Sequence, residues 1–306
     1  MTGQDAVSVQ LAAPRREAQA LSLAGDMATG TPAHYADMRI SVPACMQSVE
    51  FWEGITVRAI TRAGEFKYSN VYCRRSVDHP ARVRQPRVED LEFKGKLERR
   101  LNDEKLHVMI TNVQYYAVEL AELHTLFIAT VSRLLDVRPI ELIRPSLVLF
   151  LSGAKTIARL HNDPEHNLLF HLHGEKRVHV YRFVEQEVCP ADRPPDRWTL
   201  QIEDSAREFI SRHADDHAEY HVTPGSAVYL PRLAPHWVRA LEAFNVSLTF
   251  SFYDGEAVTR QKITRFNEWL RRRGLKPRAF AQEPRRLQLK CLGFDVLERF
   301  NRISLS

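Results

Sequence analysis

Short apolar segments separated by turn residues fill the chain between Ser146 and Tyr253, and this pattern restricts the fold more than any other feature of the sequence. The segments are rich in β-branched and aromatic residues, and many short strands in succession are typical of a β-sandwich or barrel. They are SLVLFLSG, TIARLHND, NLLFHLH, KRVHVYRF, AEYHV, SAVYLP, HWVRAL and NVSLTFSFY. Residues 184–218 interrupt the run. Their polar, proline-containing sequence predicts an insertion with a short helix near residues 204–214.

The segments that flank this β-rich core differ in character. Residues 1–36 are rich in small and polar residues and predict a flexible tail. Residues 37–255 would form one domain, in which residues 55–64 (ITVRAITRAG) favour strands and residues 117–135 predict a long helix. Residues 256–306 predict C-terminal helices with two apolar stripes. The first stripe is Ile263, Phe266 and Leu270, and the second is Leu289, Leu292, Val296, Phe300 and Ile303.

Length and composition set the class of protein. A chain of 306 residues can bury a sizeable core without cross-links. No apolar run is long enough to span a bilayer, and the N-terminus lacks the basic start and apolar stretch of a secretory signal. The four cysteines form no C-x-x-C pair, which indicates free thiols in a reducing compartment. We therefore expect a cytoplasmic protein with no membrane partner.

The net charge of +5 is unevenly distributed. From Ala257 to Ser306 ten Arg and three Lys stand against three Glu and one Asp, a net charge of +9, which leaves −4 for the first 256 residues. Such a segment could bind nucleic acid or an acidic partner. The solvated face of amphipathic helices explains the same charge, and we prefer this interpretation.

The sequence His161-Asn162-Asp163 places an imidazole and a carboxylate two residues apart. On a strand, residues i and i+2 point to the same face, so the two side chains converge. One more His from a distant strand would complete a 2-His-1-carboxylate set, which leaves positions open on a non-haem iron. Alone, H-x-D is a weak signal, because any surface turn can contain it.

The residues that follow predict an anion site. LLFHLH favours a strand, Gly174-Glu175 a two-residue turn, and KRVHVY the return strand of a hairpin. In such a hairpin Lys176 lies opposite His173 and shares the inner face with the odd-numbered residues His161, Asp163, Asn167, His171 and His173. A lysine inside a barrel is costly unless an anion meets it. The alternative is a lysine that reaches solvent at the hairpin end.

A third signal lies in PGSAVYLPRLAPHWV, residues 224–238. Gly225, Pro231 and His236 have the spacing of the second cupin motif, G-x5-P-x4-H. The proline-rich turn would bring His236 to the mouth of the barrel as the third metal ligand. A packing role beside Trp237 is the alternative.

Residues 156–183 resemble the cosubstrate-binding segment of the JmjC-type cupin hydroxylases, the Fe(II)- and 2-oxoglutarate-dependent dioxygenases that include the asparaginyl hydroxylase acting on hypoxia-inducible factor. Residues 223–253 resemble the closing strands of that family. The resemblance covers about residues 146–253. It implies a mainly β protein, a double-stranded β-helix of the cupin or jelly-roll type with flanking N-terminal α/β elements and C-terminal helices. The family pattern of H-x-D, Asn and G-x-K is filled by His161, Asp163, Asn167, Gly174 and Lys176.

This resemblance also implies roles. His161, Asp163 and His236 would bind Fe(II). Lys176 would pair with the distal carboxylate of the cosubstrate 2-oxoglutarate, and Asn167 would hydrogen-bond near it.

Other cosubstrate contacts are less closely matched. A tyrosine on an upstream strand often helps hold the distal carboxylate in the family, and Tyr115 or Tyr116 would serve here. Ala158 stands in place of a cosubstrate-binding Thr, His171 replaces a Gln and Ser251 replaces an Asn. His171 and Ser251 are therefore further candidates, and we expect a cosubstrate pocket that is not a copy of the relatives'.

The remaining histidines favour structural roles. His213, His217 and His221 could hold a second metal, but their spacing is loose and we do not prefer it.

The resemblance implies an enzyme that uses Fe(II), 2-oxoglutarate and O₂ to hydroxylate a C–H of an amino-acid side chain in a protein or peptide. Alternatives are oxygenation of a free amino-acid-derived metabolite or of tRNA, or a non-catalytic ligand-binding cupin, and demethylation is an open outcome. The related hydroxylases dimerise through helices in the C-terminal position, so we expect a homodimer. The competing expectation is that both apolar stripes pack on the chain's own barrel.

Overall fold

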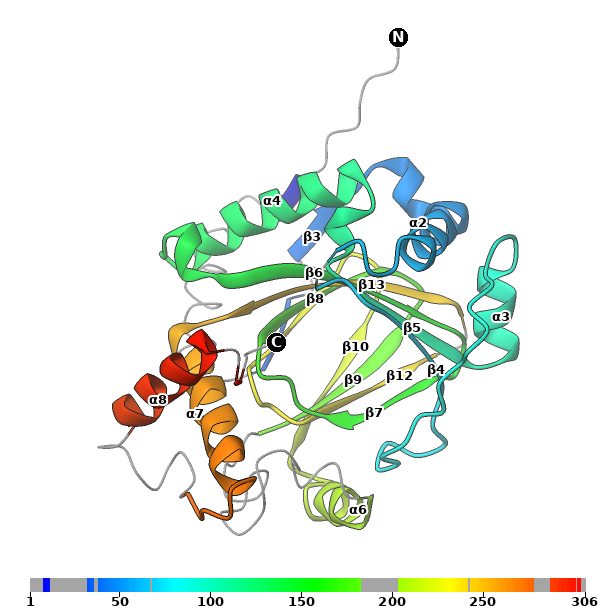
Figure 1. The fold of residues 1–306 in the computed structure, drawn as a ribbon. Coiled ribbons are helices and arrows are strands. Elements are labelled where there is room, and N and C mark those ends of the chain that lie inside the picture. The colour runs from blue at the N-terminus through cyan, green and yellow to red at the C-terminus, as the bar shows by residue number, and fades with distance from the viewer. Residues whose placement is uncertain are drawn as a thin grey trace.

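In the computed structural model the chain folds around two antiparallel sheets that face each other (Figure 1). The structure describes residues 8–11, 32–35, 38–66, 68–182, 203–241, 243–277, 287–300 and 302–303. The larger sheet has seven strands in the order β2-β11-β8-β13-β6-β5-β4, and the smaller has four in the order β10-β9-β12-β7.

The eight segments predicted as strands are all strands, and together they form most of both sheets. The fold class expected from the sequence, a mainly β protein of the cupin type, is therefore confirmed. The eight predicted strands are β6 (Ile143–Ser152), β7 (Ile157–His161), β8 (His166–His173), β9 (Lys176–Tyr181), β10 (His217–Val222), β11 (Ala227–Leu230), β12 (His236–Ala240) and β13 (Asn245–Tyr253). Two strands precede them in the larger sheet, β4 (Val71–Arg75) and β5 (Leu106–Thr111).

Two helices cover the outer face of the larger sheet, α2 (Val49–Thr61) and α4 (Val118–Leu134) (Figure 1). Helix α4 was predicted. Its apolar stripe, with Phe127 stacked on Phe250 of β13, seals the main core. Residues 55–64 were predicted as strand, and this was wrong. The helical spacing of the buried side chains begins upstream, at Trp52, and Ser48 caps the helix by accepting a hydrogen bond from the Phe51 N–H.

The hairpin predicted at Gly174-Glu175 is also wrong. Strand β8 pairs with β11 and β13 in the larger sheet, whereas β9 pairs with β10 and β12 in the smaller one. The two residues therefore carry the chain from one sheet to the other. Gly174 has φ +74°, and a Cβ there would lie 2.4 Å from the carbonyl oxygen of Phe244, so only glycine fits this crossing.

Part of the range predicted as a tail forms strands. β1 (Ser8–Leu11) pairs with β3 (Met38–Ser41), and β2 (Ala33–Tyr35) extends the larger sheet beside β11. Within the predicted insertion the structure has α6 (Glu203–Arg212), at the expected place, while residues 184–202 lie outside the described residues. The division of the chain into residues 1–36, 37–255 and 256–306 remains a prediction. Among the helices that the structure describes, none has the length and apolarity needed to cross a bilayer.

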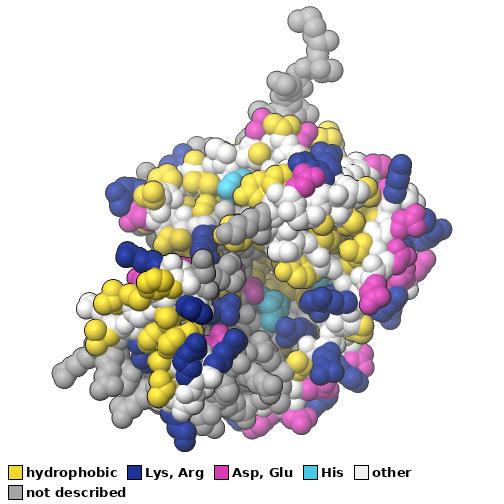
Figure 2. All heavy atoms as spheres, in the orientation of Figure 1, with side chains coloured by type: hydrophobic (Ala, Val, Ile, Leu, Met, Phe, Trp, Pro, Cys, Tyr) yellow, Lys and Arg dark blue, Asp and Glu magenta, His cyan; other side chains and the backbone are white. Residues whose placement is uncertain are grey.

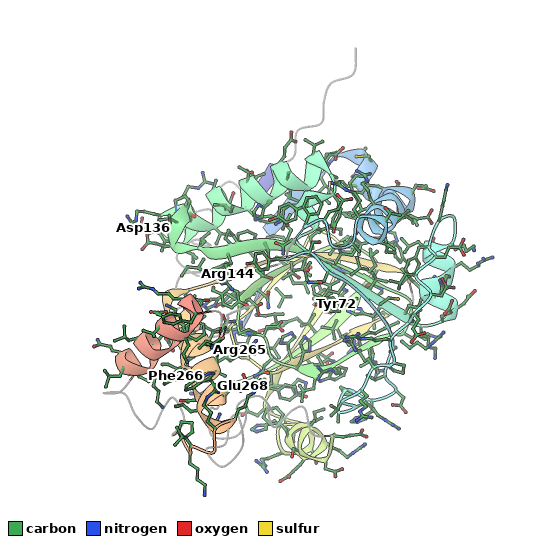
Figure 3. The ribbon with its side chains drawn as sticks, in the orientation of Figure 1. Tyr72, Asp136, Arg144, Arg265, Phe266 and Glu268 are labelled. Atoms are coloured by element: carbon green, nitrogen blue, oxygen red, sulfur yellow. The ribbon has the colours of Figure 1, made fainter. Side chains whose placement is uncertain are left out.

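The remaining described helices are α3 (Leu97–Asp103), α7 (Gly255–Arg271) and α8 (Leu287–Arg299), with short 3₁₀ turns at Ala44–Gln47, Val113–Tyr115 and Pro139–Glu141. Helices α7 and α8 pack closely. A Cβ on Gly293 would lie 2.6 Å from the ring of Phe266, which Figure 3 shows on α7 beside α8. Most of the second predicted stripe is exposed, with exposed fractions between 45% and 71% at Leu289, Leu292, Val296 and Phe300. The expectation that this stripe packs on the chain's own barrel is therefore wrong for α8.

Candidate metal centre

Three side chains from two neighbouring strands meet at one end of the space between the sheets. Strand β12 pairs with β7 so that His236 lies opposite His161, with ring centroids 4.2 Å apart. Asp163 follows β7 by two residues. Its carboxylate oxygens lie 3.9 Å from Nε2 of His161 and 3.7 Å from Nε2 of His236. One ligand atom from each residue lies within 4.8 Å of the others, so all three can reach a common ion.

Backbone carbonyls hold both imidazoles in one orientation. Nδ1–H of His161 donates to the carbonyl of Arg159 at 2.7 Å, and Nδ1–H of His236 donates to that of Ala234 at 2.9 Å. With Nδ1 protonated, the lone pair of each ring is on Nε2, the atom that faces Asp163. Hydrogen bonds of this kind orient metal-binding histidines in proteins.

Asp163 is held by a chain of polar contacts. Nδ2 of Asn167 donates to its Oδ2 at 2.9 Å, and the Ser251 hydroxyl donates to Oδ1 of Asn167. The backbone N–H of Leu233 donates to the Asp163 carbonyl at 2.6 Å. Asn167 therefore holds the Asp163 carboxylate in place, and Ser251 acts on that carboxylate indirectly, by orienting the Asn167 amide.

The charge state of the two histidines suits a divalent metal. Burial lowers the pKa of both His161 and His236 to about 4, so both are neutral at pH 7. Neutral imidazoles and an ionised carboxylate are the forms that bind metal. Two nitrogens and one oxygen on one side of an ion, with space on the other, fit a non-haem iron site.

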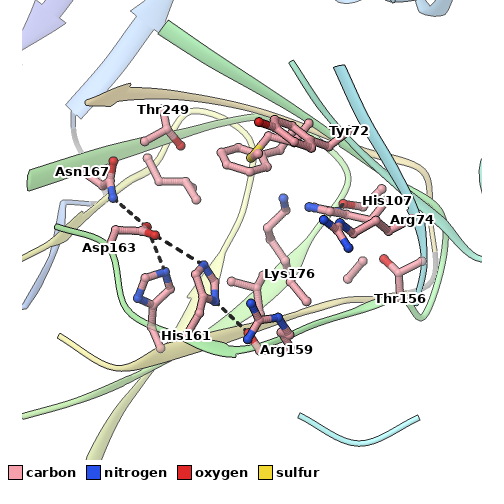
Figure 4. Close-up of a pocket in the computed structure, with 18 of the residues that line it drawn as sticks. Tyr72, Arg74, His107, Thr156, Arg159, His161, Asp163, Asn167, Lys176 and Thr249 are labelled. Carbon is pink, nitrogen blue, oxygen red and sulfur yellow. Dashed lines mark hydrogen bonds and ion pairs between the residues drawn. The ribbon is translucent and has the colours of Figure 1, made fainter. Parts of the chain in front are cut away.

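A cavity of about 280 Å³ extends from this trio between the sheets (Figure 4). Lys176 lines it and is 3% exposed, with its ammonium pointing into the space. Burial lowers the pKa of Lys176 to about 7. Lys176 lies four positions, about 13 Å of strand, before Val180 on β9, and Val180 pairs with His236. The ammonium and the trio therefore line the same cavity from separate parts of the smaller sheet.

Two arginines also line the cavity. Arg74 comes from β4 and Arg159 from β7. The pairing of β7 with β12 shifts by one residue between His161 and Ala158, and this bulge places Ala158 and Arg159, consecutive residues, both on the cavity side. Figure 2 shows a hollow with His and acidic side chains at its floor and Lys or Arg side chains beside it.

Not all predicted cosubstrate contacts lie at this cavity. Tyr115 is 46% exposed and stacks on Phe66, while Tyr116 is buried in the main core and bonds to Ser69. Neither tyrosine lines the cavity, so the structure does not support the predicted cosubstrate contact of either one. His171 is buried, but its ring nitrogens bond to Ser247 and the Gly174 carbonyl, and it does not line the cavity.

Tyr72 of β4 lines the cavity and was not predicted from the sequence. The signal was available, because VYCRR alternates and places Tyr72 and Arg74 on one face. Thr156 and Thr249 line the cavity as well and were not singled out. Thr156 lies two residues before Ala158.

The histidines of the insertion do not form the disfavoured second metal set. His221 pairs with Glu175, and among described residues His217 instead meets His179 and Glu219 on the outer side of the smaller sheet. His179 stacks on Trp237 at 3.7 Å. This group is separate from the trio described above.

Comparisons with known proteins agree with this geometry. The Cupin-like domain family matches residues 103–257, just over half of the chain. Lysine-specific demethylase 8 of Xenopus tropicalis is 30% identical over 103 residues, which are 32% of this chain and 23% of the demethylase. The chain thus matches under a quarter of that relative's length.

Among solved structures, YcfD, a ribosomal oxygenase from Escherichia coli in complex with cobalt and 2-oxoglutarate, has a TM-score of 0.50 and 14% identity. The alignment covers 97% of this chain and 70% of YcfD. At this identity the likeness concerns the fold. The resemblance inferred from the sequence is confirmed at the level of the family, and the chain belongs to the Cupin-like domain family.

Proposed function

We propose that this protein is an Fe(II)- and 2-oxoglutarate-dependent dioxygenase that hydroxylates an amino-acid side chain in a protein or peptide. One observation carries the proposal. A 2-His-1-carboxylate trio and a buried lysine without an ion-pair partner among the described residues line the same cavity.

His161, Asp163 and His236 would hold the iron. Bound there, iron with 2-oxoglutarate supplies O₂-dependent oxidation of a C–H bond, with release of succinate and CO₂. The protein's part is binding and orientation. Lys176 would donate to the distal carboxylate of 2-oxoglutarate and so set how far the cosubstrate extends into the cavity. Asn167 keeps the Asp163 carboxylate turned toward the histidines. The apolar walls, such as Leu169 and Val238, keep bulk water away.

The substrate class rests on the relatives, because one is named a lysine-specific demethylase and the other a ribosomal oxygenase. We also propose a homodimer joined through the exposed stripe of α8, whose four apolar side chains have no cover among described residues. Nucleic acid is a less favoured partner.

Succinate release tests the proposal. Purified protein with Fe(II), ascorbate and ¹³C-labelled 2-oxoglutarate should form labelled succinate in air and none under nitrogen. The Asp163→Ala variant should form none under either condition. Equal succinate from both proteins would contradict the proposal.

A further inference from the structure

Arg74 and Arg159 have no use in the reaction as proposed so far. Each comes from an edge strand, β4 of the larger sheet and β7 of the smaller, and the cavity lies between them. A bulge on β7 between Ala158 and His161 breaks the regular pairing of that strand beside Arg159. Bulges of this kind re-aim side chains next to active sites.

The two guanidinium groups are not neutralised by the protein. Among described residues, neither forms an ion pair, and the only carboxylate that lines the cavity is Asp163. Arg74 has one side-chain hydrogen bond, from Nη1 to the Gln85 carbonyl at 3.3 Å. Arg74 repels Arg159 electrostatically, and the nearest opposing charge is Asp163, which the metal would engage.

Other arginines of the chain differ. Arg75, the next residue on β4, pairs with Glu104 at 2.9 Å, and Arg232 pairs with Glu256 at 2.6 Å. Arg75 and Arg232 thus each have a carboxylate partner, whereas Arg74 and Arg159, which line one cavity, have none among the described residues. Like charges held together without a counterion are costly, so the arrangement indicates a ligand that carries the missing charge.

The proposed metal and cosubstrate do not supply the negative charge that Arg74 and Arg159 lack. A divalent ion with the Asp163 carboxylate has one net positive charge, and the doubly negative 2-oxoglutarate with Lys176 has one net negative charge. The loaded centre is then neutral, and the two positive charges of Arg74 and Arg159 remain.

We propose that Arg74 and Arg159 form an anion clamp that binds a carboxylate or phosphate group of the substrate beside the metal. This inference rests on the proposed dioxygenase function and narrows its substrate. The clamp selects an acidic side chain and rejects lysine and arginine, whose positive charge would meet two guanidinium groups in a confined space. Gln85, which also lines the cavity, can add a neutral hydrogen bond.

Binding measurements test the clamp apart from catalysis. The protein is loaded with Zn(II) and 2-oxoglutarate, which allows no turnover. Titration calorimetry then follows N-acetylated amides of aspartate, glutamate, phosphoserine, asparagine, lysine and arginine. Asparagine is the neutral match of aspartate, and phosphoserine separates a phosphate clamp from a carboxylate clamp. The variants are Arg74→Gln, Arg159→Gln and, as matched control on the same strand, Arg75→Gln.

We expect at least one acidic probe to bind ten times more tightly than its neutral match, and both lysine and arginine probes not to bind. Arg74→Gln and Arg159→Gln should each weaken the acidic probe about tenfold and change 2-oxoglutarate affinity less than twofold. Arg75→Gln should change neither. If the two substitutions weaken 2-oxoglutarate instead, the arginines belong to the cosubstrate and the clamp is refuted. Equal binding of acidic and basic probes also refutes it.

The outcome for the dioxygenase itself is read separately. Failure to bind 2-oxoglutarate and to release succinate would overturn the proposed function, whatever the probes do. Normal succinate release with no preference for acidic probes would overturn only the clamp.

Discussion

Replacing Lys176 with methionine should stabilise the ligand-free protein and strongly weaken 2-oxoglutarate binding. Lys176 is 3% exposed, and its pKa falls from 10.5 to about 7 because burial disfavours the charged form. Methionine keeps a similar length and the apolar contacts of the stem, but has no charge to desolvate.

The size and pH dependence follow from this shift. Below pH 7 Lys176 is charged in both folded and unfolded chains, so the folded state bears the full cost, at most about 5 kcal/mol at 1.36 kcal/mol per pKa unit. Between pH 7 and 10.5 the folded lysine is neutral and the unfolded one still charged, so the cost shrinks as pH rises. Above pH 10.5 it is gone. The advantage of Lys176→Met should therefore be greatest at pH 6 and less than half as large at pH 9.

Thermal unfolding of the metal-free protein measures this. At pH 6 we expect Lys176→Met to unfold roughly 5–10 °C above the wild type, given about 2 °C per kcal/mol for a chain of this size. Its affinity for 2-oxoglutarate should fall on the order of a hundredfold, since an unpaired buried carboxylate costs about 3 kcal/mol. Lys94→Met, at an exposed lysine, is the control and should change neither. A variant less stable than the wild type at pH 6, or one that still binds 2-oxoglutarate normally, would refute the assignment of Lys176.

Three further predictions concern other parts of the molecule. Asp163→Ala should abolish Fe(II) binding, measured by metal analysis after dialysis, with an unchanged circular dichroism spectrum; a full equivalent of retained iron would show that Asp163 is not a ligand. Gly174→Ala should lower the free energy of unfolding by about 2 kcal/mol or more, because φ is +74° and the added Cβ meets the Phe244 carbonyl; a denaturant midpoint equal to the wild type would contradict this. Leu292→Glu with Phe300→Glu should give a soluble monomer in sedimentation experiments, since Leu292 on α8 and Phe300 just after its end are both exposed; a wild type that is already monomeric at micromolar concentration would end the dimer proposal.

The sequence predicted the β-rich core well because its strands are bounded by turns and rich in β-branched residues. It failed where a signal lay outside the segment considered. Residues 55–64 suggested a strand, yet Trp52 and Ser48 upstream set the helical register of α2. Arg159 was missed for a different reason. It lies two residues before His161, on the inner face that alternation predicts, but its charge was not considered there. Only the place of Ala158 on the same side needs the bulge, which depends on the pairing with β12.

Lys176 was predicted to face the interior from a hairpin that does not exist. Lys176 nevertheless faces the interior, as predicted. The prediction had a second basis, the cost of burying a charged lysine without an anion. Asn167 and Leu169 of β8 face the cavity from the larger sheet, and Lys176 faces it from the smaller one, with a crossing of two residues between them. In a barrel made of two facing sheets, a crossing and a hairpin can both leave the next strand's side chain inside. Strand pairing therefore could not decide where Lys176 lies, whereas a charge that needs an anion could. The same reasoning about charge, applied to Arg74 and Arg159, underlies the proposed clamp.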